Sequence, residues 1–295
     1  MTVLQRYHVE HETRYVYTEP VSQSWQLARL TPRSLPWQKL LSHALQVDPP
    51  ADERRDVPDS FGNTVTHFGL HGAHHLLQVR MRCTVEVGER PAPQPVAGGE
   101  AWESVRDRIR REPRLDALVP ARMSGPTPLV PLSDAARDYA AESLAEGRDW
   151  FGAVCDLMHR IHADFEFEPG ATTVSTSVDE VLRQRRGVCQ DFAHLMLACL
   201  RAHGLAGRYV SGYLLTEPPP GEARLLGVDA SHAWVAAYSP SHGWVEFDPT
   251  NDQLADQRYI TLAWGADFAD VVPLRGVILG GGAQEMTVSV SVAPA

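Results

Sequence analysis

The sequence predicts an α+β protein in which an N-terminal antiparallel β domain precedes a core built from a central helix packed on an antiparallel sheet. Three observations lead to this fold class. The first ninety residues contain segments in which apolar and polar residues alternate, as in half-buried strands. The Pro/Gly-rich stretch "PAPQPVAGGE" (residues 91–100) then interrupts the pattern. Beyond it apolar residues recur at helical spacing, and one segment is apolar nearly all round, which is typical of a buried helix.

The β domain is predicted to span residues 1–95. The segments "RYHVEHETRYVY" and "HLLQVRMRCTVEV" alternate over long spans, whereas "WQLARLTPR" and "HALQVDPP" are shorter and end at prolines. The tripeptide "FGN" supplies a turn between two such runs. We therefore expect an antiparallel β domain with a boundary near residue 95.

A helical connecting segment is predicted over residues 96–150. It contains "EAWESVRDRIRRE" and "SDAARDYAAESLAEG", the second with Ser133 as a plausible N-cap. Residues 151–295 then form the predicted core together with a C-terminal strand. The core opens with the helical pattern of "DWFGAVCDLMHRIHADF".

The centre of the core is predicted from three further signals. "SVDE" (residues 177–180) is a capping box that starts a short helix, which "RRG" closes. The buried helix begins at Cys189 and ends at Gly204. After the strand-type run "RYVSGYLL", two β runs joined by "SPSHG" predict a hairpin.

Composition excludes several classes of function. The chain has 295 residues, 43% of them apolar and 22% charged, with a formal net charge of -10, so nothing favours nucleic acid or an anionic membrane as partner. No signal core and no run of about 18 apolar residues occurs, so we expect a cytoplasmic protein. The four cysteines lack CxxC spacing, which predicts free thiols.

Cys189 is the cysteine placed for chemistry. In the first turn of a helix, the macrodipole and the unpaired backbone N–H groups favour a thiolate. His232 begins the first strand of the predicted hairpin and Asp248 ends the second, so antiparallel pairing brings these two side chains towards one edge of the sheet. A cysteine nucleophile, a histidine base and an orienting carboxylate are thereby combined. Cys83, Cys155 and Cys199 are interpreted as apolar filler.

The chain resembles the transglutaminase-like superfamily, in its branch of bacterial cysteine-protease-like proteins. The resemblance rests on "GVCQDFAHLMLACLRAHGLAGRYVSGYL", "DASHAWVAAY" and "GWVEFDPTN", while "HETRYVYTEPVSQSWQLARLTPR" is similar to the N-terminal domain of that branch. It implies a papain-related α+β core in which Cys189 is the nucleophile, His232 its base and Asp248 the residue that orients the imidazole.

The predicted activity is hydrolysis of peptide or isopeptide amide bonds through a thioester, with a peptide or protein amide as substrate and no cofactor. Animal transglutaminases carry a tryptophan ahead of the nucleophile that helps to stabilise the oxyanion, and the matching stretch "TTVSTSVDEVL" has no aromatic residue. Two alternatives stay open: a transglutaminase or amide ligase with an amine acceptor, and a non-catalytic scaffold in a peptide-modifying assembly.

Three other residues are candidates for substrate or oxyanion contacts. Gln190 could supply an oxyanion donor beside the Cys189 N–H. Arg186 could attract a substrate carboxylate, although a solvated helix end is the favoured interpretation. Trp234 could line the site, although core packing is the favoured interpretation. No metal is predicted, because the spacing of one histidine cluster fits a ligand set only loosely. That cluster comprises His67, His71, His74 and His75.

Overall fold

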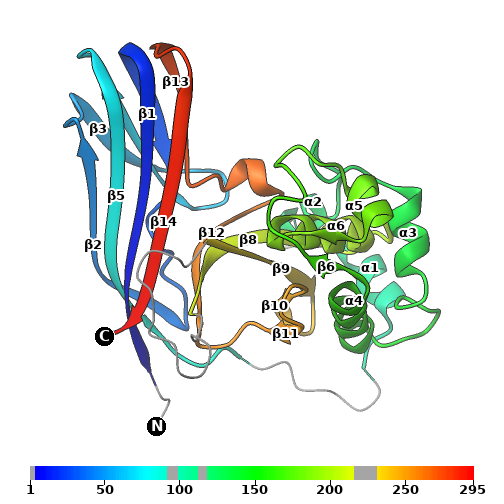
Figure 1. The fold of residues 1–295 in the computed structure, drawn as a ribbon. Coiled ribbons are helices and arrows are strands. Elements are labelled where there is room, and N and C mark those ends of the chain that lie inside the picture. Colours follow the sequence, from blue (N-terminus) through cyan, green and yellow to red (C-terminus); the bar gives the residue numbers. More distant parts are fainter. Residues whose placement is uncertain (1–3, 92–98, 112–117, 216–230) are drawn as a thin grey trace, which may run out of the picture.

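The computed structural model describes residues 4–91, 99–111, 118–215 and 231–295. These residues form a curved antiparallel half-barrel and a core of helices on a second antiparallel sheet (Figure 1). The α+β class predicted from the sequence is confirmed. The predicted domain boundary near residue 95 lies outside the described residues.

The half-barrel is organised around one long strand, β1. The first half of β1 lies between β5 and β14, and its second half lies between β4 and β13. Further out, β2 pairs with β5 and β3 pairs with β4. The strands are β1 (Gln5–Ala28), β2 (Gln38–Asp48), β3 (Glu53–Pro58), β4 (Thr64–Leu70), β5 (His74–Val87), β13 (Leu274–Gly280) and β14 (Gln284–Pro294).

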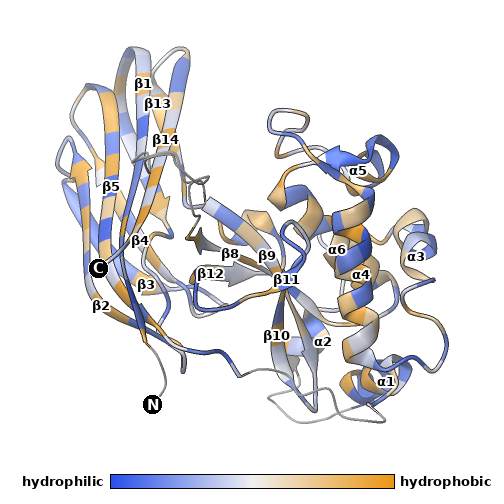
Figure 2. Ribbon diagram, turned by 60° about the horizontal axis from the view of Figure 1, so that its bottom comes forward, coloured by the Kyte–Doolittle hydropathy of each residue, from blue (hydrophilic) through white to orange (hydrophobic). Residues whose placement is uncertain are grey.

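The alternation seen in the sequence becomes the two faces of this sheet. Along β1, Tyr7, Val9, His11 and Thr13 are buried while the residues between them are more exposed, and Figure 2 shows the same alternation of hydropathy along β5. The segment "RYHVEHETRYVY" and the start of "WQLARLTPR" belong to one strand, β1, whose pairing with β5 shifts register between residues 16 and 21.

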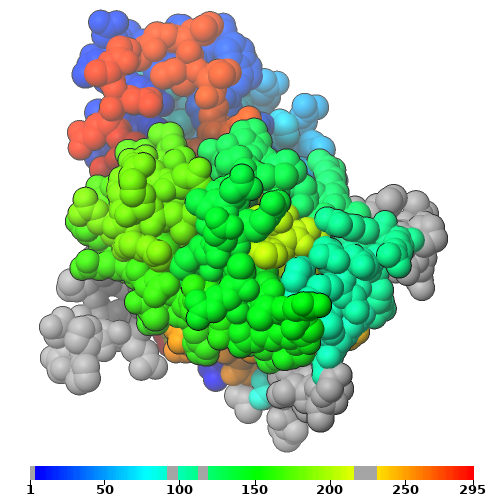
Figure 3. All heavy atoms as spheres, turned by 90° about the vertical axis from the view of Figure 1, so that its right-hand side faces the viewer, coloured from blue at the N-terminus to red at the C-terminus, as the bar shows by residue number. Residues whose placement is uncertain are grey.

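The C-terminal segment belongs to the first sheet and not to the core sheet. Both of its strands pair with β1, and residues from the two ends of the chain therefore lie together (Figures 1 and 3). This differs from the expectation of a single strand appended to the core. The reason is long-range pairing: β1 has a second edge to satisfy, and the strand that fills it is about 270 residues away in sequence.

The core sheet is antiparallel, in the order β11-β10-β9-β8-β12. Helix α6 packs on β8 and β9, and every residue from Asp191 to Arg201 is buried. The strands are β8 (Gly207–Leu214), β9 (Ser231–Ser239), β10 (Gly243–Asp248), β11 (Gln253–Leu254) and β12 (Tyr259–Gly265). The helices are α1 (Trp102–Arg111), α2 (Leu118–Arg122), α3 (Asp134–Ala140), α4 (Trp150–Asp164), α5 (Val178–Gln184), α6 (Cys189–Ala202) and the 3-10 helix η2 (Phe268–Asp270). Two short strands, β6 (Glu166–Phe167) and β7 (Arg186–Gly187), pair in parallel.

Both predicted N-cap serines are present, but only half of the predicted capping box forms, because the Glu180 side chain accepts from the Gln184 amide at 2.7 Å and not from the Ser177 N–H. Ser133 accepts from the Ala136 N–H at the start of α3, and Ser177 accepts from the Glu180 N–H at the start of α5. Helix α5 ends at Arg185, which adopts the left-handed conformation with φ of 57°. Among the described residues, no helix is long and apolar enough to cross a membrane.

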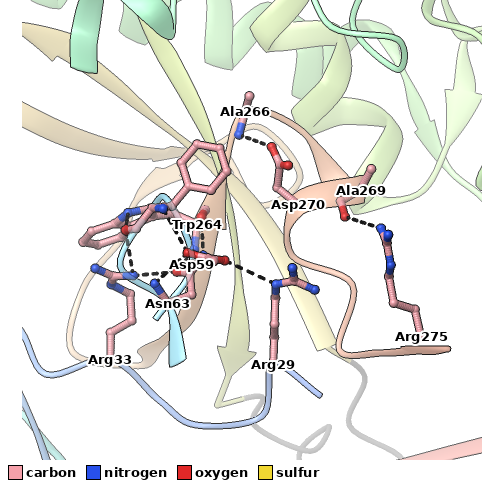
Figure 4. Close-up of polar contacts among 10 residues, drawn as sticks. Arg29, Arg33, Asp59, Asn63, Trp264, Ala266, Ala269, Asp270 and Arg275 are labelled. Carbon is pink, nitrogen blue, oxygen red and sulfur yellow. Dashed lines mark hydrogen bonds and ion pairs between the residues drawn. The ribbon is translucent and has the colours of Figure 1, made fainter. Parts of the chain in front are cut away.

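Side-chain amides join the half-barrel to the edge of the core sheet. The Gln38 amide donates to the Thr261 carbonyl (2.7 Å) and accepts from the Thr261 N–H (2.8 Å). The Asn63 side-chain amide likewise donates to the Trp264 carbonyl (2.8 Å) and accepts from the Trp264 N–H (3.0 Å) (Figure 4). Both amides imitate a neighbouring strand, so the backbone groups of Thr261 and Trp264 on the edge strand β12 are satisfied without one.

Candidate active site

Cys189 is the first residue of α6. The Asp191 carboxylate accepts from the Val188 N–H (2.8 Å) and from the Thr172 hydroxyl (2.6 Å), which fixes the helix start. The amides of Asp191 and Phe192 bond to the Val188 carbonyl. The amides of residues 189 and 190 have no preceding helical turn to bond, so they are available to an oxyanion.

His232 and Asp248 come from the hairpin of β9 and β10. The strands pair with Phe247 opposite Val235, so His232 lies at the open end of the hairpin, diagonally across from Asp248. The His232 Nε2 donates to the Asp248 Oδ2 at 2.7 Å, and the Asp248 side chain is fully buried. Cys189 also interacts with the His232 ring, since it is one of the groups that raise the pKa of the imidazole. The structure therefore brings Cys189, His232 and Asp248 together.

The electrostatics of this group favour a charged histidine. Burial by itself would lower the pKa of His232, but the hydrogen bonds to Asp248 and Cys189 outweigh it and raise the pKa to about 10. Burial likewise opposes the charge of Asp248, yet its hydrogen bonds hold the pKa of that carboxyl below its ordinary value. A charged imidazole beside a sulfur atom is the arrangement that cysteine nucleophiles use.

Residues that the sequence analysis did not single out hold the Asp248 carboxylate. Its Oδ2 also accepts from the Tyr259 hydroxyl (2.6 Å) and the Asn251 side chain (2.7 Å), while its Oδ1 accepts from the N–H groups of Thr250 (2.9 Å) and Asn251 (3.3 Å). Asn251 lies two residues after Pro249 in the segment "DPTN", so a turn motif there could have indicated it. Tyr259 lies on another strand and carries no signal in the sequence.

Trp234 is fully buried, and it also contacts the site. Its ring stacks on the His232 imidazole with centroids 6.0 Å apart, and its indole N–H donates to Glu246 at 3.0 Å. Trp234 therefore packs in the core and also contacts the His232 ring.

Gln190 and Arg186 are placed differently. Gln190 is half-buried beside Cys189, and within the described ranges its side chain makes no hydrogen bond. The Arg186 guanidinium forms an ion pair with Glu168 at 3.1 Å and is half-exposed. This partner fits the interpretation of a solvated surface cation.

The other cysteines are free thiols in apolar surroundings. Burial raises the pKa of Cys83 to about 12 and that of Cys155 to about 11, and it also raises the pKa of the fully buried Cys199. In the part of the chain that the structure describes, no three His, Cys, Asp or Glu residues converge as a metal site would need. The four clustered histidines lie on β4, on β5 and in the turn between them.

Comparison with known proteins identifies the family. Residues 7–86 match the "Bacterial transglutaminase-like N-terminal region" and residues 137–249 match the "Transglutaminase-like superfamily". An uncharacterized protein of Mycobacterium tuberculosis is 41% identical over 302 residues, covering 98% of this chain and 93% of that protein. One of Mycobacterium leprae is 33% identical over 290 residues, covering 97% and 98%. The chain belongs to the transglutaminase-like superfamily.

The fold and one distant relative add detail. A crystal structure of a Cytophaga hutchinsonii protein named a "Putative Cysteine Protease" superposes with a TM-score of 0.76 at 20% identity, covering 100% of this chain and 93% of that one. The "Protein-glutamine gamma-glutamyltransferase" of Pseudomonas aeruginosa is 30% identical over 129 residues, which are 43% of this chain and 19% of that protein.

Proposed function

We propose that the protein is a cysteine-dependent hydrolase of peptide or isopeptide amide bonds, with Cys189 as nucleophile, His232 as acid and base, and Asp248 as the positioning residue. One observation carries the proposal: the His232 ring is held by the buried Asp248 through Nε2, and Cys189 is close enough to help raise the pKa of that ring. This arrangement supplies an activated nucleophile, a proton donor for the leaving amine and a fixed imidazole orientation.

The chemistry proceeds in two halves. The Cys189 thiolate attacks the carboxamide carbon, and the oxyanion forms at the start of α6, where the free backbone amides and the helix dipole stabilise it. When the tetrahedral intermediate collapses, the C–N bond breaks and the His232 imidazolium gives its proton to the departing amine. Neutral His232 then takes a proton from water, which attacks the thioester and releases the acid.

Water is the favoured acceptor of the acyl group held in the thioester. Residues 172–182 contain no aromatic side chain to match the oxyanion tryptophan of animal transglutaminases. In the structure Thr172 is bound to Asp191 and serves the helix start. The similarity to the Pseudomonas glutamyltransferase supports the second candidate, transfer of the acyl group to an amine. A scaffold without catalysis is disfavoured because all three members of the proposed triad are present and adjacent.

The test separates these functions. A mixture of glutamine-containing peptides, peptide amides and lysine isopeptides is incubated with the protein in water enriched in heavy oxygen, with and without excess glycine amide. We expect acid products that carry the heavy isotope. They should persist with Cys199→Ala and disappear with Cys189→Ala, a matched change in the same helix.

Predominant glycine amide adducts would establish the transferase in place of the hydrolase. Products that survive Cys189→Ala would refute a role for this cysteine. No product from any substrate, together with no selective alkylation of Cys189, would favour the scaffold.

A further inference from the structure

A cavity of about 1080 Å³ lies between the half-barrel and the core sheet. It is on the sheet face turned away from α6, because Tyr209, Val235 and Phe247 pack with α6, whereas the alternate residues Val210 and Trp234 form a separate cluster. Its lining comes from the start of β1, the segment before β2, strands β8, β10 and β12, and residues 254–258. Cys189, His232 and Asp248 are not among its lining residues.

Arg208 is the unusual member of this lining. Only 6% of its surface is exposed, and its guanidinium carbon lies 3.6 Å from the centre of the Trp264 ring and 4.4 Å from that of the Trp244 ring. Its Nε is buried without a partner, and within the described ranges the guanidinium makes no hydrogen bond or ion pair. Burial lowers the pKa of Arg208 to about 9, which leaves it a cation at neutral pH.

The other charged residues that line this cavity are ion-paired or solvated. Arg90 forms an ion pair with Glu246 at 3.2 Å, and Arg258 forms one with Asp256 at 2.6 Å. Glu89 is exposed and remains solvated. Glu246 is the opposing charge near Arg208, but it is already ion-paired with Arg90, so among the described lining residues Arg208 has no ion pair of its own. A buried charge without its own partner is costly unless a ligand pairs with it.

Two further polar atoms in the lining lack partners. The indole Nε1 of Trp37 is a buried donor, and the Oε1 of Glu246 is a buried acceptor. A ligand that carries a carboxylate and an N–H group could therefore satisfy groups that the chain leaves unpaired. Tyr7, Leu215 and Leu254 add apolar surface to the same cavity.

We propose that this cavity binds a monocarboxylate with an apolar body, of the kind found in an N-acylated amino acid or a peptide C-terminus. The guanidinium of Arg208 lies over the rings of Trp244 and Trp264, so a planar carboxylate would approach the edge of the guanidinium, in the bidentate arrangement that arginine favours. The carboxylates of Glu89, Glu246 and Asp256 disfavour a ligand with a second negative charge. The site is separate from the proposed nucleophile and does not depend on its activity.

The test uses N-acetylphenylalanine and its neutral amide, titrated by calorimetry into the wild-type chain and into Cys189→Ser, which prevents turnover. We expect saturable binding of the acid by both proteins and binding of the amide that is about tenfold weaker or more, because a charge-assisted hydrogen bond is lost. Arg208→Gln should weaken the acid to the level of the amide. Arg14→Gln, which removes the same charge from an exposed position on β1, should leave binding unchanged.

Hydrogen exchange of the wild-type chain locates the ligand without any variant. Protection should appear in residues 242–246 and 254–258, which line the cavity. Absence of saturable binding, equal affinity for acid and amide, or protection confined to residues 188–192 would overturn the proposal. If Arg208→Gln does not fold, Arg208→Lys keeps the charge without the fork and should still weaken the acid selectively.

Discussion

Asp248→Asn tests the electrostatic basis of the proposed site. The Asp248 Oδ2 accepts from three donors, His232, Tyr259 and Asn251, and its Oδ1 accepts from two backbone N–H groups. An amide presents its own N–H groups to one of these two sets of donors, whichever way it is turned. The charge-assisted bond to His232 is lost in either orientation.

The expected effect is large and can be measured without a known substrate. A hydrogen bond to a charged group is worth about 1.5–3 kcal/mol, which corresponds to a roughly ten- to hundredfold smaller population of the thiolate–imidazolium pair. The rate of Cys189 alkylation by iodoacetamide should fall by that factor near neutral pH. In a plot of the alkylation rate against pH, the fall on the acid side should move to higher pH, because a less stabilised imidazolium yields its proton more readily to the sulfur.

The control is Asp267→Asn, which changes another buried carboxylate, one that accepts from the Ala269 N–H. It should lower the free energy of unfolding and leave the alkylation profile unchanged. An Asp248→Asn protein that is folded and is alkylated with the wild-type pH profile would refute the reasoning.

Four further outcomes are expected. Limiting iodoacetamide at neutral pH should label Cys189 ahead of Cys83, Cys155 and Cys199, whose pKa values are raised by burial, and peptide mapping that finds equal labelling would contradict this. Asp248→Asn should lower the free energy of unfolding measured in urea, and its difference from the wild type should become smaller as pH rises from about 6.5 to about 10. The reason is that the raised pKa of His232 stabilises the fold only while the ring is protonated in the native state. Asn63→Ala should cost about 2–4 kcal/mol of unfolding free energy by stripping partners from the Trp264 backbone, whereas Gln46→Ala on the exposed face of β2 should cost little. Gly212→Ala should be strongly destabilising, since its Cβ would meet the Ile260 carbonyl oxygen and, at 2.6 Å, the Trp234 ring, and Gly72→Ala, with nothing within 4 Å, is the control.

Local sequence determined the elements that carry the proposed site. The nearly uniform apolar character of residues 189–203 requires a buried helix, and a cysteine before it has to lie at the helix start. Two β runs joined by a short turn pair as a hairpin, and that register sets His232 and Asp248 near one another; the predicted five-residue turn is shortened to residues 240–242, because Ser239 and Gly243 pair. These features depend on periodicity and turn chemistry over short distances, which a single sequence contains.

Tertiary structure decided how distant segments complete those elements. Tyr259 reaches Asp248 only because β12 folds back along β8, and no spacing in the chain encodes that approach. The C-terminal strands joined β1 because an unpaired strand edge can be satisfied by any segment with matching pattern, and sequence alternation does not name the partner. Arg208 looks like an ordinary strand cation in the sequence, and it became a buried charge only when β10 and β12 brought Trp244 and Trp264 against its guanidinium. Long-range pairing and the burial it produces are set by the whole chain, so they are absent from any local pattern.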